Sequence, residues 1–100
     1  HALLGVVKCV SKELAPRGIT VNAVCPGWVD TPMAQADVVK TAQARGLERD
    51  AVEAEIHAGI PIGRMVSADE CAALIAWLAS PDAAAITGEA YNISGGEFFA

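Results

Sequence analysis

Aromatic residues, clustered basic residues and long apolar runs are all scarce in this sequence, and each shortage excludes a class of protein. Aromatic residues make up 5% of the 100 positions, and the 7 Lys and Arg residues are scattered. A surface that follows nucleic-acid phosphates needs clustered basic side chains, so we expect no nucleic-acid partner. The longest uncharged runs, 18–29 and 71–81, are shorter than the about 20 residues that a membrane-spanning helix needs, so we expect no membrane partner.

Cysteine is scarce too, and its spacing excludes a metal site of a familiar kind. Cys9, Cys25 and Cys71 are far apart, and no paired Cys or Cys/His spacing occurs. We therefore expect no metal, and we interpret the three thiols as small buried side chains in a reducing, cytoplasmic compartment. The first residue is His1, and no basic segment followed by an apolar one opens the chain, so we expect the natural start of the protein to be absent.

What the sequence does contain is a high share of apolar residues in helical and strand patterns. Hydrophobic residues make up 53% and the net charge is −5, which is typical of a packed domain or of part of one. The spacing predicts, in order, a helix over 2–15, a strand over 19–25, helices over 33–44 and 48–58, a helix over 68–79 and a strand over 89–93. A strand, a helix and a further strand in this order are typical of an α/β fold with a parallel sheet.

Two of the predicted helices have apolar faces that should be buried. The stripe on the first helix is broad enough to predict burial on two sides, and it comprises Leu3, Val7, Val10 and Leu14. The helix over 68–79 should begin at a capping box made by Ser67 and Glu70. Its predicted buried residues are Cys71, Leu74, Ile75 and Leu78.

The helices between 33 and 58 are more polar than the other elements. Their inward residues should be Val38, Val39, Val52 and Ile56. Such a pair is too polar to form a core, so we interpret residues 33–58 as a flap over a binding site.

The most sharply punctuated strand end lies at Pro26-Gly27. Pro26 lacks an amide donor, and Gly27 accepts unusual backbone angles, so the strand should end and the chain should turn. Thr31 and Pro32 then suit the N-cap and the first position of the next helix. In open α/β sheets ligands bind beyond the carboxyl ends of strands, and helix N-termini favour phosphate or carbonyl oxygens. The alternative is that the same residues form only a turn and a cap.

The stretch Asn-Ala-Val-Cys-Pro-Gly-Trp-Val-Asp-Thr-Pro-Met, residues 22–33, resembles the segment after the sixth strand of the short-chain dehydrogenase/reductases. The resemblance extends to 1–5, 60–64 and 92–96, and thus to nearly the whole chain. It implies an α/β fold, the C-terminal part of a doubly wound, Rossmann-type parallel sheet, within a single NAD(P)-binding domain. The chain looks most similar to 3-hydroxybutyrate dehydrogenases, 3-oxoacyl-carrier-protein reductases and polyketide ketoreductases.

The resemblance also implies roles for the residues around the turn. Pro26 and Gly27 would shape the main chain near the nicotinamide of NAD or NADP, and the Val29 backbone would bind the carboxamide. The Thr31 hydroxyl would reach the carboxamide or the pyrophosphate. Trp28 and Met33 flank this site as candidate substrate residues, with Trp28 packing either over cofactor and substrate or against the flap. We interpret Asp30 as a solvated turn carboxylate.

The catalytic residues of the family have no counterpart in this chain. The family uses a Tyr-x-x-x-Lys pair with an upstream Ser, whereas Tyr91, the only tyrosine, is followed by Gly95 at that spacing. No glycine-rich pyrophosphate loop is present, and His1 to Gly5 look like the residues directly after the catalytic Lys. We therefore assign no catalytic residue here and expect an enzyme that interconverts a small alcohol and a carbonyl only in a longer protein.

The family resemblance implies a homodimer or homotetramer. The helix over 2–15 would pair with its copy, and the helix over 68–79 with the strand over 89–93 would form a second contact. The apolar residues that favour such contacts are Leu4, Val6, Trp77, Phe98 and Phe99. The alternative function is a non-catalytic dimerisation or binding module derived from such an enzyme.

Overall fold

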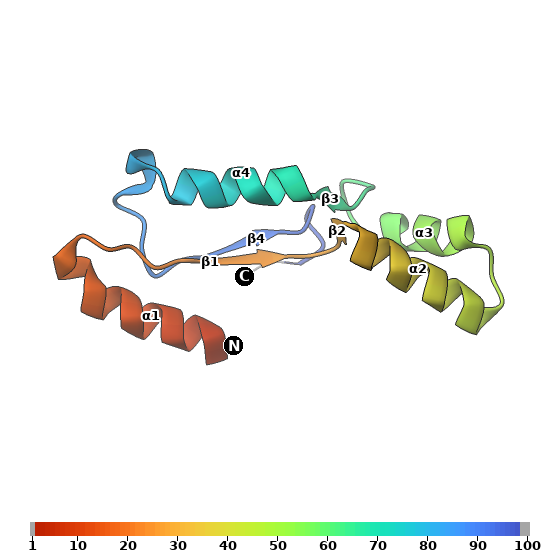
Figure 1. Cartoon of the computed structure of the whole chain (residues 1–100), viewed down its shortest axis with the longest axis horizontal. Helices are drawn as coiled ribbons and strands as arrows, with labels where there is room; N and C mark the ends of the chain where they lie inside the picture. Colours follow the sequence, from red (N-terminus) through yellow and green to blue (C-terminus); the bar gives the residue numbers. More distant parts are fainter. Residues whose placement is uncertain (1, 99–100) are drawn as a thin grey trace.

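A computed structural model describes residues 2–98, which form helices and short parallel strands (Figure 1). The elements in chain order are α1 (Ala2–Leu14), η1 (Ala15–Arg17), β1 (Ala23–Pro26), β2 (Val29–Asp30), α2 (Pro32–Arg45), α3 (Arg49–Ala58), β3 (Val66–Ser67), α4 (Ala68–Leu78), η2 (Pro81–Ala83) and β4 (Ala90–Ile93). The expectations for His1 and Phe99 lie outside the described residues.

The central strands β1 and β4 pair in parallel, as the strand–helix–strand order predicts. Ala23 pairs with Ala90 and Pro26 with Ile93, and the Gly27 amide extends the ladder by donating to the Ile93 carbonyl at 3.1 Å. In Figure 1, α1 and α4 lie on opposite sides of these two strands. The carboxyl ends of both strands therefore meet at one edge, where the 26–31 segment begins.

The predicted strand over 19–25 is wrong at both ends. It begins at Ala23 and includes Pro26. Residues 21 and 22 are held by side chains instead: the Val21 amide donates to Thr87 Oγ1 at 3.0 Å, and Asn22 Nδ2 donates to the Ile86 carbonyl at 3.0 Å. Pro26 is tolerated because it occupies the last ladder position, where a missing donor is least costly.

A second parallel pair, β2 with β3, was not predicted. Val29 pairs with Val66, and the Val66 amide donates to the Trp28 carbonyl at 2.9 Å. Each strand has two residues, which is too short to show an alternating pattern. This pairing ties the segment after the Pro-Gly turn to the start of α4.

The capping predictions are confirmed. The Thr31 hydroxyl accepts from the Ala34 amide at 3.2 Å, and Ser67 and Glu70 form both bonds of a capping box. Gly18 and Gly46 end α1–η1 and α2 in left-handed conformations, with φ of 74° and 65°. The bonds of Thr31 and Ser67 fix the starts of α2 and α4 beside the β2–β3 pair.

The pair α2–α3 contains the best-buried cluster of the described residues, so the interpretation that it is too polar for a core is wrong. Val38 is 1% exposed and Val52 2% exposed. The other members of the cluster are Ala34, Ala42, Ile60 and Met65, with Trp28 and Ile56 packed against it. Small apolar residues at helical spacing are enough for two helices to pack closely, although most of their surface is polar. Val39, predicted inward, is 39% exposed.

The apolar faces of α1 and α4 are less covered than predicted. In α1 only Val7 and Ser11 are buried, and Leu3 is 69% exposed. No residue of α4 is buried, and Ile75 is 54% exposed. The three cysteines are not buried either: Cys9 is exposed, and Cys25 and Cys71 are half-buried. A two-stranded sheet is too narrow to cover both helices.

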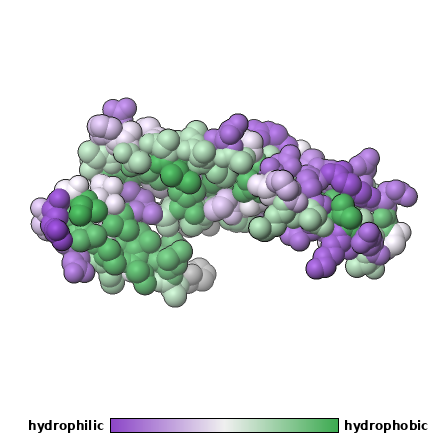
Figure 2. All heavy atoms as spheres, in the orientation of Figure 1, coloured by the Kyte–Doolittle hydropathy of each residue, from purple (hydrophilic) through white to green (hydrophobic). Residues whose placement is uncertain are grey.

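The described chain is elongated, with extents of 55 × 26 × 22 Å. Its radius of gyration is 16.9 Å, whereas a compact domain of 100 residues has about 13 Å. Figure 2 shows hydrophobic residues gathered over α1 and hydrophilic residues over α2 and α3.

Candidate functional site

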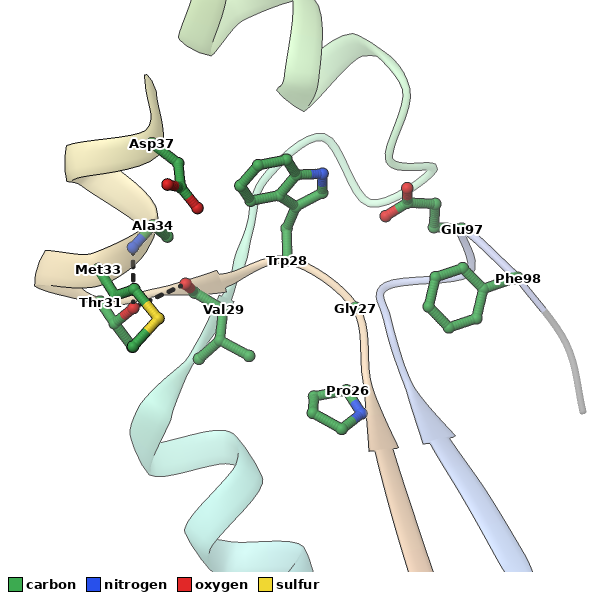
Figure 3. A pocket seen from close by; sticks show the side chains of 10 residues that line it. All are labelled: Pro26, Gly27, Trp28, Val29, Thr31, Met33, Ala34, Asp37, Glu97 and Phe98. Atoms are coloured by element: carbon green, nitrogen blue, oxygen red, sulfur yellow. Dashed lines mark hydrogen bonds between the residues drawn. The ribbon is translucent and has the colours of Figure 1, made fainter. Parts of the chain in front are cut away.

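A pocket of about 420 Å³ lies beyond the carboxyl end of β1 (Figure 3). Its lining residues are Pro26, Gly27, Trp28, Val29, Thr31, Met33, Ala34, Asp37, Glu97 and Phe98. All six residues predicted to contact cofactor or substrate are in this set. The volume is within the range of about 300–1,000 Å³ found for small-molecule sites.

Gly27 brings the main chain of the pocket against the loop after β4. A Cβ at this position would lie 2.9 Å from the Ser94 Cβ and 3.1 Å from the Ser94 Cα, and Ser94 is only 3% exposed. Any side chain would therefore push the two segments apart. The need for glycine comes from this close approach, because the φ of Gly27 is not among the positive ones.

Thr31 connects the pocket wall to α2. Its hydroxyl accepts from the Ala34 amide at 3.2 Å and donates to the Val29 carbonyl at 3.4 Å. A hydroxyl has two acceptor lone pairs, so one lone pair is left for an incoming N–H group. The bond to Val29 is long for an O–H donor, so the proton is weakly held and can turn toward another acceptor. Helix capping and ligand binding by Thr31 are therefore compatible.

Trp28 contacts both the helical pair and the pocket. Its side chain packs against the α2–α3 cluster and also lines the pocket. The packing against the helical pair is thus observed, and contact with cofactor or substrate stays a prediction, since one face of a large ring can pack on protein while another borders the cavity. Met33 lines the pocket too, yet it is 78% exposed, so its flexible side chain stands at the rim.

Two residues that line the pocket, Glu97 and Phe98, were not predicted from the sequence. They fold back over the pocket after Gly95 and Gly96, whose φ values are 66° and 89°. Ser94 Oγ accepts from the Phe98 amide at 3.4 Å, which holds this return. The Gly-Gly pair after the last strand was the available signal for such a turn.

Ala34 and Asp37, which line the pocket from α2, were not predicted either. They lie on the face of α2 that carries Met33, at spacings that share one helical face. Asp30 does not line the pocket; it is exposed and accepts from Gln35 Nε2 at 2.9 Å, as expected for a solvated carboxylate.

A further ion pair lies between the 59–64 loop and the helix that follows β3. Arg64 Nη1 and Nη2 donate to the two Glu70 carboxylate oxygens at 2.7 and 3.0 Å. The Arg64 guanidinium, helped by the Ser67 amide, lowers the pKa of Glu70 to about 2. The same pairing raises the pKa of Arg64. The pair thus joins the 59–64 loop to the start of α4.

Within residues 2–98, no group of three or more His, Cys, Asp or Glu side chains is placed to hold a metal ion. Across the same residues, the helices are all too short or too polar to span a membrane.

The pocket can bind and orient a flat, largely apolar group. Pro26, Trp28, Val29 and Phe98 supply apolar walls, and Thr31 with the backbone beside it supplies polar groups, as do the carboxylates of Asp37 and Glu97. Tyr91 is not among the lining residues. The chemistry of these walls suits a nicotinamide ring with its carboxamide, which combines an apolar face with one donor and one acceptor group.

Comparison with known proteins identifies the class. The family described as enoyl-(acyl carrier protein) reductase matches residues 1–97. The chain therefore belongs to this family, and it is a short-chain dehydrogenase/reductase, as its motifs predicted. The α/β architecture agrees with the Rossmann folds of structurally similar family members.

Individual relatives are similar over nearly the whole chain. A protein assigned as the ketoacyl reductase of the monensin polyketide synthase of Streptomyces virginiae is 48% identical over 96 residues, which cover 96% of this chain and 37% of the relative. A D-beta-hydroxybutyrate dehydrogenase of Rhizobium meliloti is 36% identical, covering 96% of this chain and 38% of the relative. The crystal structure of an F189W actinorhodin polyketide ketoreductase with NADPH is 43% identical with a TM-score of 0.88, over 97% of this chain and 37% of that one. The chain thus spans well under half the length of these proteins.

Proposed function

We propose that this chain forms the nicotinamide-side wall and substrate flap of an NAD(P)-dependent oxidoreductase that interconverts an alcohol and a ketone. The observation that carries the proposal is the pocket beyond β1, where Pro26, Gly27, Val29 and Thr31 line one cavity with Trp28. A nicotinamide cofactor would supply hydride chemistry there. The NADPH in the similar actinorhodin ketoreductase supports such a cofactor, and the choice between NAD and NADP stays open.

The chain's own residues would bind and orient rather than transfer protons. The Val29 carbonyl and the Thr31 hydroxyl would hold the carboxamide, because they place two acceptors side by side that can receive its NH2 group. Pro26, Trp28 and Phe98 would exclude water from the reacting face. The general acid and the ribose contact would come from a Tyr-x-x-x-Lys pair outside this chain, so the 100 residues alone should be inactive.

The names of the relatives support a ketone or alcohol of the 3-oxoacyl or 3-hydroxyacyl kind, with a polyol as the wider alternative. Three free cysteines support a reducing, cytoplasmic setting. The exposed apolar residues of α1 and α4 support assembly into a homodimer or homotetramer. The same surfaces favour the second candidate function, a non-catalytic dimerisation or binding module.

A chimera tests the proposal. This chain would replace the matching segment of the actinorhodin ketoreductase, and NADPH oxidation with a ketone would be followed. We expect turnover. A Thr31→Val change should raise the KM for NADPH roughly tenfold, because it removes both a neutral hydrogen bond to the cofactor and the N-cap of α2. Thr31→Ser, which keeps the hydroxyl, is the matched control.

A chimera that assembles and remains folded but neither binds NADPH nor reduces ketones would contradict the enzyme and favour the binding module. The gene offers a second test, because the proposal requires a Tyr-x-x-x-Lys pair ending directly before His1. If the gene encodes no such pair, the protein lacks the proposed general acid.

A further inference from the structure

Two acidic side chains face the pocket from opposite sides. Asp37 comes from α2 and Glu97 from the segment after β4, 60 positions apart in the sequence. Figure 3 shows their carboxylates on either side of the Trp28 ring. Both belong to the formal net charge of −5 at pH 7.

Among residues 2–98, no positive side chain balances these two charges. The described residues that line the pocket include no Lys, Arg or His. Among the described residues, neither Asp37 nor Glu97 takes part in an ion pair. Arg49, which extends from α3 toward α2, is already bound to Asp50, Glu53 and Gln35. The pocket therefore combines apolar walls with negative charge at two rims.

We infer that Asp37 and Glu97 are specificity residues that select an uncharged carbonyl substrate and exclude a free carboxylate. The inference rests on the proposed function and narrows its substrate class. An anionic group in the pocket would meet two like charges and no compensating cation from residues 2–98, whereas an ester, a thioester or a simple ketone would meet only the apolar walls. Selection by repulsion of this kind separates a 3-oxoacid from its neutral esters, although their reacting carbonyls are the same.

The test compares acetoacetate with methyl acetoacetate as substrates of the full-length protein, with NADH and NADPH both supplied. The two probes differ in one charge and one methyl group. The measured quantity is the ratio of kcat/KM for the ester to that for the acid. We expect the wild type to prefer the ester, and the double variant Asp37→Asn with Glu97→Gln to lower the ratio roughly tenfold, as expected for two partly solvated like charges.

The matched control is Asp82→Asn with Glu89→Gln. It removes the same formal charge at exposed positions that do not line the pocket, and it should leave the ratio unchanged. Ionic strength gives a second measurement that needs no variant. Added salt should narrow the wild-type preference, because exposed charges are screened, and should have little effect on the double variant.

A wild type that prefers acetoacetate, or a ratio that stays the same in the double variant, would overturn the inference while the reductase activity stands. An equal shift in the control variant would overturn it too, because the effect would then come from overall charge. A full-length protein that reduces neither probe nor any other ketone with either cofactor would instead contradict the proposed function on which the inference rests.

Discussion

The helical pair α2–α3 and the helices that flank the central strands bury their apolar residues to very different degrees. In the pair, Val38 and Val52 are nearly inaccessible, although the helices look polar in sequence. On α1 and α4, Leu3 and Ile75 are more than half exposed, although these helices look apolar. Burial depends on whether a partner surface is present, not on the apolar content of a helix alone.

This difference has a functional consequence for the pocket. The pair packs through residues of its own, together with Ile60 and Met65, so the α2 wall of the site is built within the chain. The flanking helices leave apolar surface that favours contact with further protein. We expect the pair to keep its structure under changes that loosen the region around β1 and β4.

The largest effect should come from breaking the core of the pair. Val38→Asp places a carboxylate where the side chain is 1% exposed, and an unpaired buried charge costs several kcal/mol, about 3–5 by comparison with broken buried pairs. Amide hydrogen exchange followed by mass spectrometry should show loss of protection over residues 32–58, with β1 and β4 less affected.

Val39→Asp is the control for this change, because the neighbouring side chain is 39% exposed. It should alter protection little, within about 0.5 kcal/mol for a surface substitution. Equal loss of protection in both variants would show that the pair has no core of its own.

Val38 and Val39 show how far the sequence could predict the α2–α3 pair. The helical spacing predicts both Val38 and Val39 on the inward face, but successive residues of a helix point about 100° apart, so only Val38 reaches the centre of the narrow contact. The capping interactions of Thr31 and Ser67 were predictable, because each depends on residues within three positions.

The pocket was predictable on one side only. The residues from Pro26 to Met33 are contiguous, so a strand end followed by a helix brings them together by local geometry. Glu97 and Phe98 reach the site through a return held by Ser94, and β2 pairs with β3 across 37 positions (Val29 to Val66). Contacts between distant segments leave no periodic pattern in one sequence, so both were missed.

An intermediate effect should follow from closing the space at Gly27. Gly27→Ala would bring a Cβ within 2.9 Å of Ser94 and separate the pocket turn from the loop after β4. Overpacking of this kind costs about 1–3 kcal/mol. The denaturation midpoint of the full-length protein should fall, and its affinity for NAD(P)H, measured by fluorescence titration, should fall as well.

Gly5→Ala is the matched control, since a Cβ at Gly5 meets nothing within 4 Å outside its chain neighbours and the nearby backbone of α1. This change should raise stability by about 0.5–1 kcal/mol through helix propensity. A Gly27→Ala protein with unchanged midpoint and cofactor affinity would show that the close approach to Ser94 has no role in the site.

The smallest effect should come from breaking the Arg64–Glu70 ion pair. The pKa of Glu70 is lowered from an ordinary 4.5 to about 2, first by the hydrogen bond from Arg64 and then by that from the Ser67 amide. A lowered folded-state pKa adds stability above the ordinary value, and that stability is lost as the pH falls toward 2. The stability difference between the wild type and Glu70→Gln should therefore be full at pH 6 and should shrink between about pH 4.5 and 2.

The Glu70 side chain is 42% exposed, so this difference should be small and should weaken with added salt. Glu55→Gln, which breaks the Arg45–Glu55 pair between α2 and α3, should show the same direction with a smaller amplitude, because Arg45 alone lowers the pKa of Glu55. Glu48→Gln is the control: its side chain forms no cap bond, and it is in no ion pair of the described residues. Urea denaturation at pH 6, 4 and 2.5 measures the stability of all three variants against the wild type. A stability difference for Glu70→Gln that does not change with pH would show that the pair with Arg64 does not form in solution.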